Sequence, residues 1–364
     1  MTNNKLLKSE ERAVITLRAL YKSYGYLPYK MSKFEEYDLY AGNKDFLVSD
    51  RVITFNDTDG KLLALKPDVT LSIIKNSAPD GEKRKVYYNE NVYRVSAATG
   101  HFKEIMQAGL ECIGELDLTD TFEVVTLAAK SLAQISGDYV LDLSHMGILN
   151  ALLSDVDERL VGKITALVAK KNAHEILALS TDGTLDAATS ERLASLTSMY
   201  GDMQSVLERL RPICITDAAK AAYSELYALC ELIMKTELAS HVRLDFSVVN
   251  NMSYYNGIVF RGFLSGIFES VLCGGEYGKL LENMKMKGGA VGFALYLDLL
   301  SQLRAEKSEY DVDVLLLYTD GAEAEMLSVK DSLISSGKSV FSSKNIPENI
   351  RYGETVRVGG CENA

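Results

Sequence analysis

The feature of this sequence that most constrains its fold is a block of helical pattern placed between two groups of strand patterns. Strand-like apolar runs occupy 85–94, 105–115 and 139–144 before the block, and 242–249, 257–264 and 267–273 after it. Within the block, from residue 148 to about 240, apolar residues recur every three or four positions, as on one face of a helix. This order predicts an α+β fold in which a helical insertion interrupts a mostly antiparallel sheet.

Shorter patterns complete this outline. Apolar spacing predicts a helix over 10–24, and the turn Asp57–Gly60 predicts a hairpin between two short strands. The apolar residues over 290–303 are spaced as on an amphipathic helix. We expect a main domain over 1–308, with the insertion at about 148–240, and a short α/β segment over 309–364 that is marginal for a core of its own.

The charge balance weighs against a nucleic-acid partner. Lys plus Arg number 39 and Asp plus Glu number 50, which gives a formal net charge of −11 at pH 7. Proteins that grip a phosphate backbone usually carry a basic surface that displaces counterions. The first residues are polar and charged, unlike a signal peptide, and no apolar stretch has membrane-spanning length. We expect a cytoplasmic protein that binds another protein or a small molecule, and neither nucleic acid nor a membrane.

The side chains that usually bind metals or form disulfides are scattered along the chain. The five cysteines show no C-x-x-C spacing, and the four histidines show no spacing typical of a zinc site. The cysteines are therefore expected to be reduced thiols, and we expect no metal and no other cofactor.

Several local patterns are ambiguous when taken singly, and their order along the chain makes them informative about the family. Taken alone, Gly274-Gly275 most often forms a tight turn, and Tyr254-Tyr255 most often packs in a sheet. Five segments together resemble class II aminoacyl-tRNA synthetases, and the histidyl-tRNA synthetase family in particular: 65–70 (LKPDVT), 92–94 (VYR), 104–114 (EIMQAGLECIG), 250–259 (NNMSYYNGIV) and 289–300 (GAVGFALYLDLL). The resemblance spans roughly residues 8–303 and implies the antiparallel sheet of that fold, flanked by helices.

The resemblance implies a pocket for a free amino acid. It assigns Asp68 and Thr70 to the α-amino group, Gln107 and Glu111 to polar positions on one strand, and Tyr254, Tyr255 and Tyr277 to an imidazole pocket. These residue types suit histidine, because a carboxylate pairs with its ammonium group and Glu111 can accept a hydrogen bond from an imidazole N–H. Gln107 and Glu111 lie four apart on a strand, so we expect them on the same face. The alternative is an inherited polar cavity that no longer binds anything.

The residues that would hold ATP are less complete. Adenylate formation places negative charge on the α-phosphate, which cationic side chains must stabilise. Of the arginines that the resemblance implies, the first one of motif 2 is kept as Arg94, which we interpret as a vestigial nucleotide site. The other positions are occupied by Asn250, Leu299, His101, Lys103 and Glu276. We therefore expect no synthetase activity and no catalytic residues.

This combination resembles the regulatory subunits of short-form ATP phosphoribosyltransferase, since the last 55 or so residues are also too few for an anticodon-binding domain. The resemblance implies a non-catalytic protein that activates the short catalytic subunit. It also implies that free histidine acts through this protein as a feedback effector of the first step of histidine biosynthesis. A homodimer within a larger hetero-oligomer is implied as well, with dimer contacts near 31–40.

Two other functions remain open from the sequence. The chain could be an adenylate-forming or amide ligase acting on histidine or a related amino acid, for which Arg94 is the favourable feature. It could also be a paralogue that scaffolds another protein. Asn250 and Leu299 favour the regulatory interpretation over the ligase, because neither side chain carries a positive charge.

Overall fold

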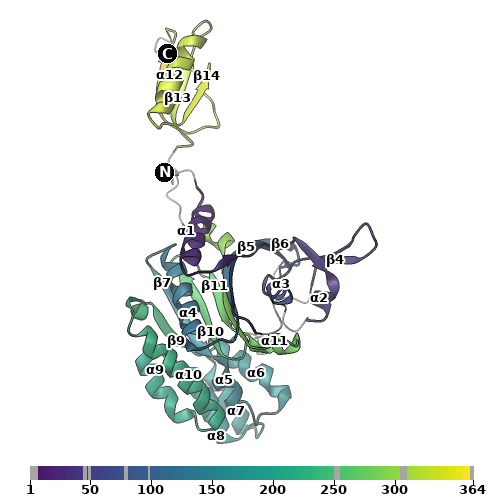
Figure 1. Ribbon diagram of the computed structural model, residues 1–364. Coiled ribbons are helices and arrows are strands. Elements are labelled where there is room, and N and C mark those ends of the chain that lie inside the picture. Colours follow the sequence, from purple (N-terminus) through teal and green to yellow (C-terminus); the bar gives the residue numbers. More distant parts are fainter. Residues whose placement is uncertain are drawn as a thin grey trace. The chain divides into compact units, whose positions relative to one another are not determined.

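The computed structural model describes residues 7–43, 47, 51–77, 81–96, 99–249, 255–303 and 310–360. The chain forms two compact units, Met1–Leu303 and Arg304–Ala364 (Figure 1). The first unit contains a large sheet with helices and a small sheet, and the second contains a separate three-stranded sheet. In the described residues, no helix has the length and apolar character needed to cross a membrane.

The large sheet organises the first unit, with the strand order β1-β5-β6-β12-β11-β10-β7-β9-β8. Its strands are β1 (Leu27–Pro28), β5 (Arg84–Val95), β6 (Phe102–Gly114), β7 (Tyr139–His145), β8 (Tyr200–Gly201), β9 (Val242–Asp245), β10 (Ile258–Leu264), β11 (Leu272–Glu276) and β12 (Gly289–Tyr296). Neighbouring strands are antiparallel, except that β1 is parallel to β5 and β7 is parallel to β9. The predicted α+β class, with a mostly antiparallel sheet like that of class II synthetases, is confirmed.

One face of the large sheet is buried under helices. α1 (Ser9–Ser23) and α4 (Leu118–Ala133) pack on this face, and α10 (Asp217–Ile233) packs against α4. Strand residues such as Leu110 and Phe293 belong to this core, and Tyr21 of α1 meets Phe293 edge-on, with 6.0 Å between ring centroids. Strand side chains alternate between faces, so the residues next to these apolar positions point to the opposite face.

Helices fill most of the interval between β7 and β9, as the helical pattern predicts (Figure 1). Before α10 come α5 (Met146–Leu152), α6 (Glu158–Ala169), α7 (Ala173–Thr181), α8 (Ala187–Leu196), α9 (Met203–Leu210) and the 3-10 turn η2 (Arg211–Ile213), and η3 (Glu237–Ser240) follows it. The six α-helices α5 to α10 each begin at a side chain that accepts a backbone N–H, namely His145, Asp157, Asn172, Asp186, Asp202 and Thr216. Such caps satisfy donors that the first helical turn leaves unpaired, which fixes where each helix starts.

A small sheet and three short helices cover part of the opposite face of the large sheet. The small sheet has the order β2-β4-β3, with β2 (Phe34–Glu36), β3 (Thr54–Asn56) and β4 (Leu62–Leu65). The predicted hairpin joins β3 to β4, and Gly60 has a φ of 87°, which favours glycine. The helices are α2 (Tyr37–Ala41), α3 (Thr70–Lys75) and α11 (Gly278–Asn283), which share a second core with Tyr88 of β5.

The prediction of a helix over 290–303 is wrong. Gly289–Tyr296 forms the strand β12, and Leu297–Gln302 forms a 3-10 turn, η4. β12 lies between β6 and β11 in the middle of the sheet, so its residues are apolar or small on both faces. A continuous apolar run of this kind has no period of two, and apolar spacing alone cannot separate it from a buried helix.

The second unit is a small α/β segment, as the sequence predicts. β13 (Val312–Tyr318) lies between β14 (Val340–Ser343) and β15 (Tyr352–Val358), and both pairs are parallel. α12 (Glu323–Ser335) follows β13 in the chain, and its Met326 shares a small core with Leu316 and Val358.

Candidate functional site

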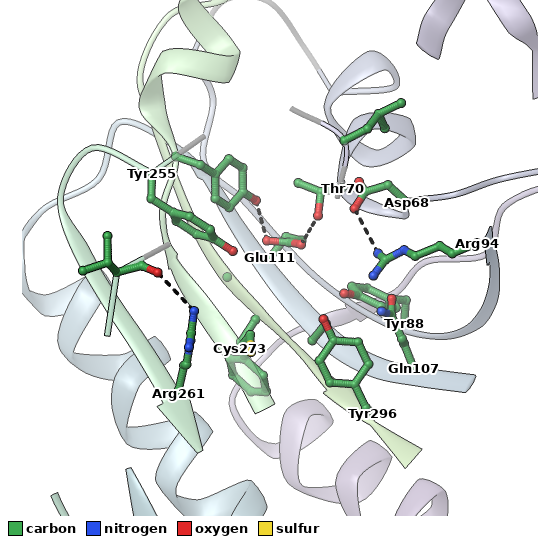
Figure 2. A pocket seen from close by; sticks show the side chains of 16 residues that line it. Asp68, Thr70, Tyr88, Arg94, Gln107, Glu111, Tyr255, Arg261, Cys273 and Tyr296 are labelled. Carbon is green, nitrogen blue, oxygen red and sulfur yellow. Dashed lines mark hydrogen bonds and ion pairs between the residues drawn. The ribbon is translucent and has the colours of Figure 1, made fainter. Parts of the chain in front are cut away.

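A cavity of about 340 Å³ opens on the face of the large sheet opposite the helix-covered core (Figure 2). Its walls come from strands of the sheet, from the start of α3 and from the segments before β10 and α11. The lining residues are Leu47, Asp68, Thr70, Tyr88, Arg94, Gln107, Glu111, Val249, Tyr255, Arg261, Cys273, Tyr277, Gly292, Phe293, Ala294 and Tyr296. A cavity of this size suits a small organic molecule.

Strand register places the polar side chains on the floor of the cavity. Gln107 of β6 lies opposite Tyr296 of β12, and Glu111 lies opposite Gly292. Gln107 and Glu111 share a face, as their spacing predicts. A Cβ on Gly292 would lie 1.6 Å from Glu111 Oε2 and 2.5 Å from the Leu110 carbonyl oxygen. β12 therefore needs a glycine here to leave room for the carboxyl group.

Glu111 accepts two side-chain hydrogen bonds inside the cavity. Thr70 Oγ1 donates a hydrogen bond to Glu111 Oε1 at 2.8 Å, and the Tyr277 hydroxyl donates to Oε2. Glu111 is only 2% exposed, and this burial raises its pKa to about 8, although the two hydroxyl groups oppose the shift. At pH 7 the Glu111 carboxyl is therefore mostly protonated in the absence of a ligand.

Asp68 and Arg94 form a second polar group beside Glu111. Arg94 Nε donates to the Pro67 carbonyl at 2.8 Å, and Arg94 Nη2 lies 3.9 Å from Asp68 Oδ2. Burial raises the pKa of Asp68, while Arg94 and the backbone N–H of Leu71 lower it. A carboxylate offers about four lone-pair sites, so Asp68 can still accept hydrogen bonds from a bound ammonium group.

The side-chain amide nitrogen of Gln107 is a hydrogen-bond donor whose acceptor is not found among the described residues. Its Nε2 is buried, and no residue among those described accepts a hydrogen bond from it. A buried donor left unpaired costs about 1–3 kcal/mol, so such groups are normally satisfied. Because Gln107 lines the cavity, a bound molecule with an acceptor atom would satisfy it.

Tyrosine rings form much of the remaining wall. Tyr255 and Tyr277 lie close to Glu111, and Tyr88 and Tyr296 line the part near Gln107 and Arg94 (Figure 2). Burial raises the pKa of Tyr88 and of Tyr255, so both hydroxyls stay neutral at pH 7. A tyrosine offers a flat apolar surface and one hydroxyl, which suits a small ring that also carries nitrogen atoms.

Most of the residues that the sequence singles out meet in this cavity: Asp68, Thr70, Arg94, Gln107, Glu111, Tyr255 and Tyr277. Tyr254 and Asn250 lie outside the described residues. The binding role of each residue stays a prediction. The sequence did not predict four further lining residues, Tyr88, Arg261, Cys273 and Tyr296. Arg261 could have been found from the sequence, because it is the single charged residue in the otherwise apolar strand β10 (IVFRGFL).

Other positions at which the resemblance expects arginine lie outside the cavity lining. Leu299 packs against the main core from η4. Lys103 Nζ lies 2.9 Å from Asp298 Oδ2, in a pair that is partly exposed. Glu276 accepts hydrogen bonds from Thr121 Oγ1 at 2.7 Å and from the Ile258 N–H at 2.9 Å. At these described positions, the chain places no positive charge in the cavity.

The described residues contain no group of three or more His, Cys, Asp or Glu side chains that could hold a metal ion. The polar groups of the cavity are carboxyls, phenols, the Thr70 hydroxyl, the Cys273 thiol, an amide and guanidinium groups. These groups can bind and orient a charged small molecule through hydrogen bonds and ion pairs.

Comparison with known proteins finds similarity to histidyl-tRNA synthetases and to ATP phosphoribosyltransferase regulatory subunits. The family described as histidyl-tRNA synthetase matches residues 4–300. An ATP phosphoribosyltransferase regulatory subunit from Oceanobacillus iheyensis is 24% identical over 328 residues, which cover 88% of this chain and 80% of that protein. A solved ATP phosphoribosyltransferase regulatory subunit/histidyl-tRNA synthetase from Bacillus halodurans has a TM-score of 0.76 at 22% identity, covering 98% of this chain and 96% of the other. An ATP phosphoribosyl transferase (HisG:HisZ) complex from Thermotoga maritima contains a chain with a TM-score of 0.63 at 21% identity, covering 79% of this chain and 97% of that one.

Proposed function

The chain belongs to the histidyl-tRNA synthetase family, and we propose that within it the protein acts as the regulatory subunit of ATP phosphoribosyltransferase. The relative from Oceanobacillus iheyensis carries this name, and the similar chain from Thermotoga maritima was solved in a complex of that enzyme. In this role the protein catalyses no reaction itself. It binds a separate catalytic chain in the cytoplasm and changes the rate of its reaction in histidine biosynthesis.

The observation that carries this proposal is a polar cavity suited to an amino acid beside an incomplete ATP site. Leu299 and Glu276 occupy positions where a synthetase of this kind would carry arginines, and Lys103 is paired with Asp298. Removing one contact that stabilises transition-state charge typically costs about 10²–10³ in rate. Several such losses in one site leave little adenylate formation, while binding of the amino acid itself is retained.

The effector that fits the cavity is free histidine. Its ammonium group faces Asp68 and Thr70, and its imidazole lies between Tyr255, Tyr277 and Glu111. Tyr254 is assigned to the same pocket from the sequence. Thr70 and Tyr277 each occupy one Glu111 oxygen, and the ionised carboxylate has further lone pairs for an imidazole N–H. Arg94 is retained beside Asp68 without an ATP to hold.

Histidine regulates the enzyme through its unequal affinity for two states of the assembly. A ligand shifts an equilibrium between two states only by as much as it binds one of them more tightly. We place the catalytic chain, a homodimer of this chain with contacts near 31–40, and histidine in one hetero-oligomer that needs neither nucleic acid nor a membrane.

Reconstitution with the short catalytic chain from the same genome tests this function. Phosphoribosyl transfer is measured for the catalytic chain alone, for the mixture, and for the mixture with L-histidine. The expected result is activation by this protein and its suppression by histidine. A mixture that neither associates nor changes in rate would contradict the proposal.

A ligase is the second candidate, because two guanidinium groups, those of Arg94 and Arg261, line the cavity. Histidine-dependent exchange of pyrophosphate into ATP measures this activity directly. We expect no exchange above background. Clear turnover by the purified chain would replace the regulatory function with the ligase.

A further inference from the structure

Arg261 is a second cation of the cavity, and it comes from a different part of the sheet than Arg94. It lies on β10, opposite Cys273 of β11, and both residues line the cavity. In the strand order β5-β6-β12-β11-β10, Arg94 and Arg261 stand on opposite sides of the β6 residue Glu111. Figure 2 shows the two guanidinium groups on either side of the Glu111 carboxyl.

The head of Arg261 is held at one end of the cavity. Arg261 Nη2 donates a hydrogen bond to the Val249 carbonyl at 3.1 Å. Val249 directly precedes position 250, where the chain has Asn in place of the arginine that the resemblance implies. The following strand therefore brings a guanidinium group to Val249, from a position eleven residues after Asn250 in the chain.

A bound amino acid needs such a cation. Its ammonium and carboxylate groups are attached to the same carbon, and the cavity already holds the carboxyl groups of Asp68 and Glu111. A third carboxylate placed there without a positive partner would be repelled and poorly solvated. Arg94 already contacts the Pro67 carbonyl and lies beside Asp68, so it balances the charge at the ammonium end.

The spacing of the strands is compatible with a ligand between Glu111 and Arg261. Neighbouring strands lie about 4.8 Å apart, so three steps from β6 to β10 separate the two backbones by roughly 14 Å. A glutamate side chain, a small amino acid and an extended arginine can fill that distance together. The floor between them consists of Gly292, Ala294 and Cys273, which are small enough to leave the space open.

We infer that Arg261 holds the carboxylate of the amino acid bound in this cavity and supplies the positive charge that position 250 lacks. This inference rests on the proposed binding of histidine. It makes Arg261 a specificity residue that distinguishes amino acids from amines of the same shape. Bidentate guanidinium–carboxylate pairs are among the strongest hydrogen-bonded contacts in proteins.

The experiment compares two ligands that differ in the carboxylate. L-histidine and L-histidinol, which has a hydroxymethyl group in its place, are titrated by calorimetry into the full chain. We expect the wild type to prefer histidine roughly ten- to a hundredfold, the usual strength of a charge-assisted hydrogen bond. In Arg261→Gln the affinity for histidine should fall to that for histidinol, and the affinity for histidinol should stay the same. Arg261→Lys keeps the positive charge but loses the paired N–H donors of the guanidinium group, so its preference for histidine over histidinol should be intermediate.

Two matched variants make the result specific. Arg243→Gln removes an exposed arginine of β9 outside the cavity lining and should leave both affinities unchanged. Equal weakening of both ligands in Arg261→Gln would show a structural role only and overturn the inference. So would an Arg94→Gln chain that loses the preference while Arg261→Gln keeps it. A wild type that binds neither ligand would overturn the proposed histidine sensing, and this inference with it.

Discussion

At the scale of single residues, Glu111 sets the charge of the cavity before a ligand arrives. The carboxyl is buried, its pKa is raised to about 8, and hydroxyl groups of Thr70 and Tyr277 contact its two oxygens. A ligand that brings a positive group or an N–H donor to this carboxyl favours its ionised form. Under the proposed function, binding of histidine and loss of a proton from Glu111 are therefore linked.

Glu111→Gln should weaken histidine binding at least tenfold while leaving the fold intact. Glutamine has nearly the same shape and can still accept the Tyr277 hydrogen bond, but it cannot become negatively charged, and a hydrogen bond to a charged group is worth about 1.5–3 kcal/mol. Calorimetry measures the affinity, and circular dichroism checks the fold. Glu104→Gln, which changes an exposed acid on the same strand, serves as the control. Unchanged affinity in Glu111→Gln would mean that histidine binds elsewhere.

The same carboxyl makes stability depend on pH in a defined direction. The pKa of Glu111 is about 8 in the folded chain against an ordinary value of 4.5, so the folded state binds more protons between these values. The contribution of Glu111 to the unfolding free energy is fully present below about pH 4.5 and is lost as pH rises towards 8, at up to about 1.4 kcal/mol per pH unit. Urea unfolding at pH 5.5, 6.5 and 7.5 should show the wild type losing stability relative to Glu111→Gln. Parallel pH curves would contradict the raised pKa.

The site residues differ in how far sequence could predict them. Asp68, Gln107 and Glu111 stand in segments that resemble one family, so the resemblance places them together. Arg261 enters the cavity through the register of β10 with β11, which depends on strand pairing rather than on local spacing. The contact between Gly292 and Glu111 joins strands that are far apart in sequence, so local pattern does not reveal it.

At the scale of elements, β12 packs closely between β6 and β11, and its small residues leave space for the cavity. Gly292 faces Glu111, and Ala294 continues the floor of the cavity beside Cys273. Because these small residues and their apolar neighbours show no period of two, the sequence pattern predicts a helix where the structure has this strand. The strands 85–94, 105–115 and 257–264 and the helical block between β7 and β9 are predicted from the sequence, because their apolar patterns are local signals.

Gly292→Ala should destabilise the protein by about 1–3 kcal/mol, the usual cost of overpacking a well-packed core. The added Cβ would meet the Leu110 carbonyl oxygen, which belongs to the neighbouring backbone, as well as the Glu111 carboxyl. Thermal and urea unfolding measure the loss, and histidine affinity should fall with it. A variant as stable as the wild type would show that the two strands can separate at little cost.

Gly162→Ala is the matched glycine replacement and should act in the opposite direction. Gly162 lies on the exposed side of α6, and a Cβ there meets nothing within 4 Å. Alanine is favoured over glycine inside a helix by roughly 0.5–1 kcal/mol, so the midpoint of unfolding should rise slightly. Destabilisation by this variant would contradict the open space found around Gly162 on α6.

At the scale of the whole molecule, the two units divide the tasks of the proposed function. Every residue that lines the cavity lies between Leu47 and Tyr296, inside the first unit. The second unit has its own parallel sheet and a small core around Leu316. The proposed histidine binding therefore belongs to the first unit, and contact with the catalytic chain is a task that the second unit can perform.

A chain that ends at Leu303 separates these tasks. It should fold and bind histidine within about twofold of the full chain's affinity, because it keeps the complete cavity and both larger cores. Calorimetry on the two chains measures this, and mixing each with the catalytic chain measures activation. If the shortened chain is folded but has lost its affinity, the second unit contributes to the histidine site and the division is wrong. If it binds histidine and no longer activates, the second unit is needed for the catalytic partner. Retained binding together with retained activation would assign both tasks to the first unit.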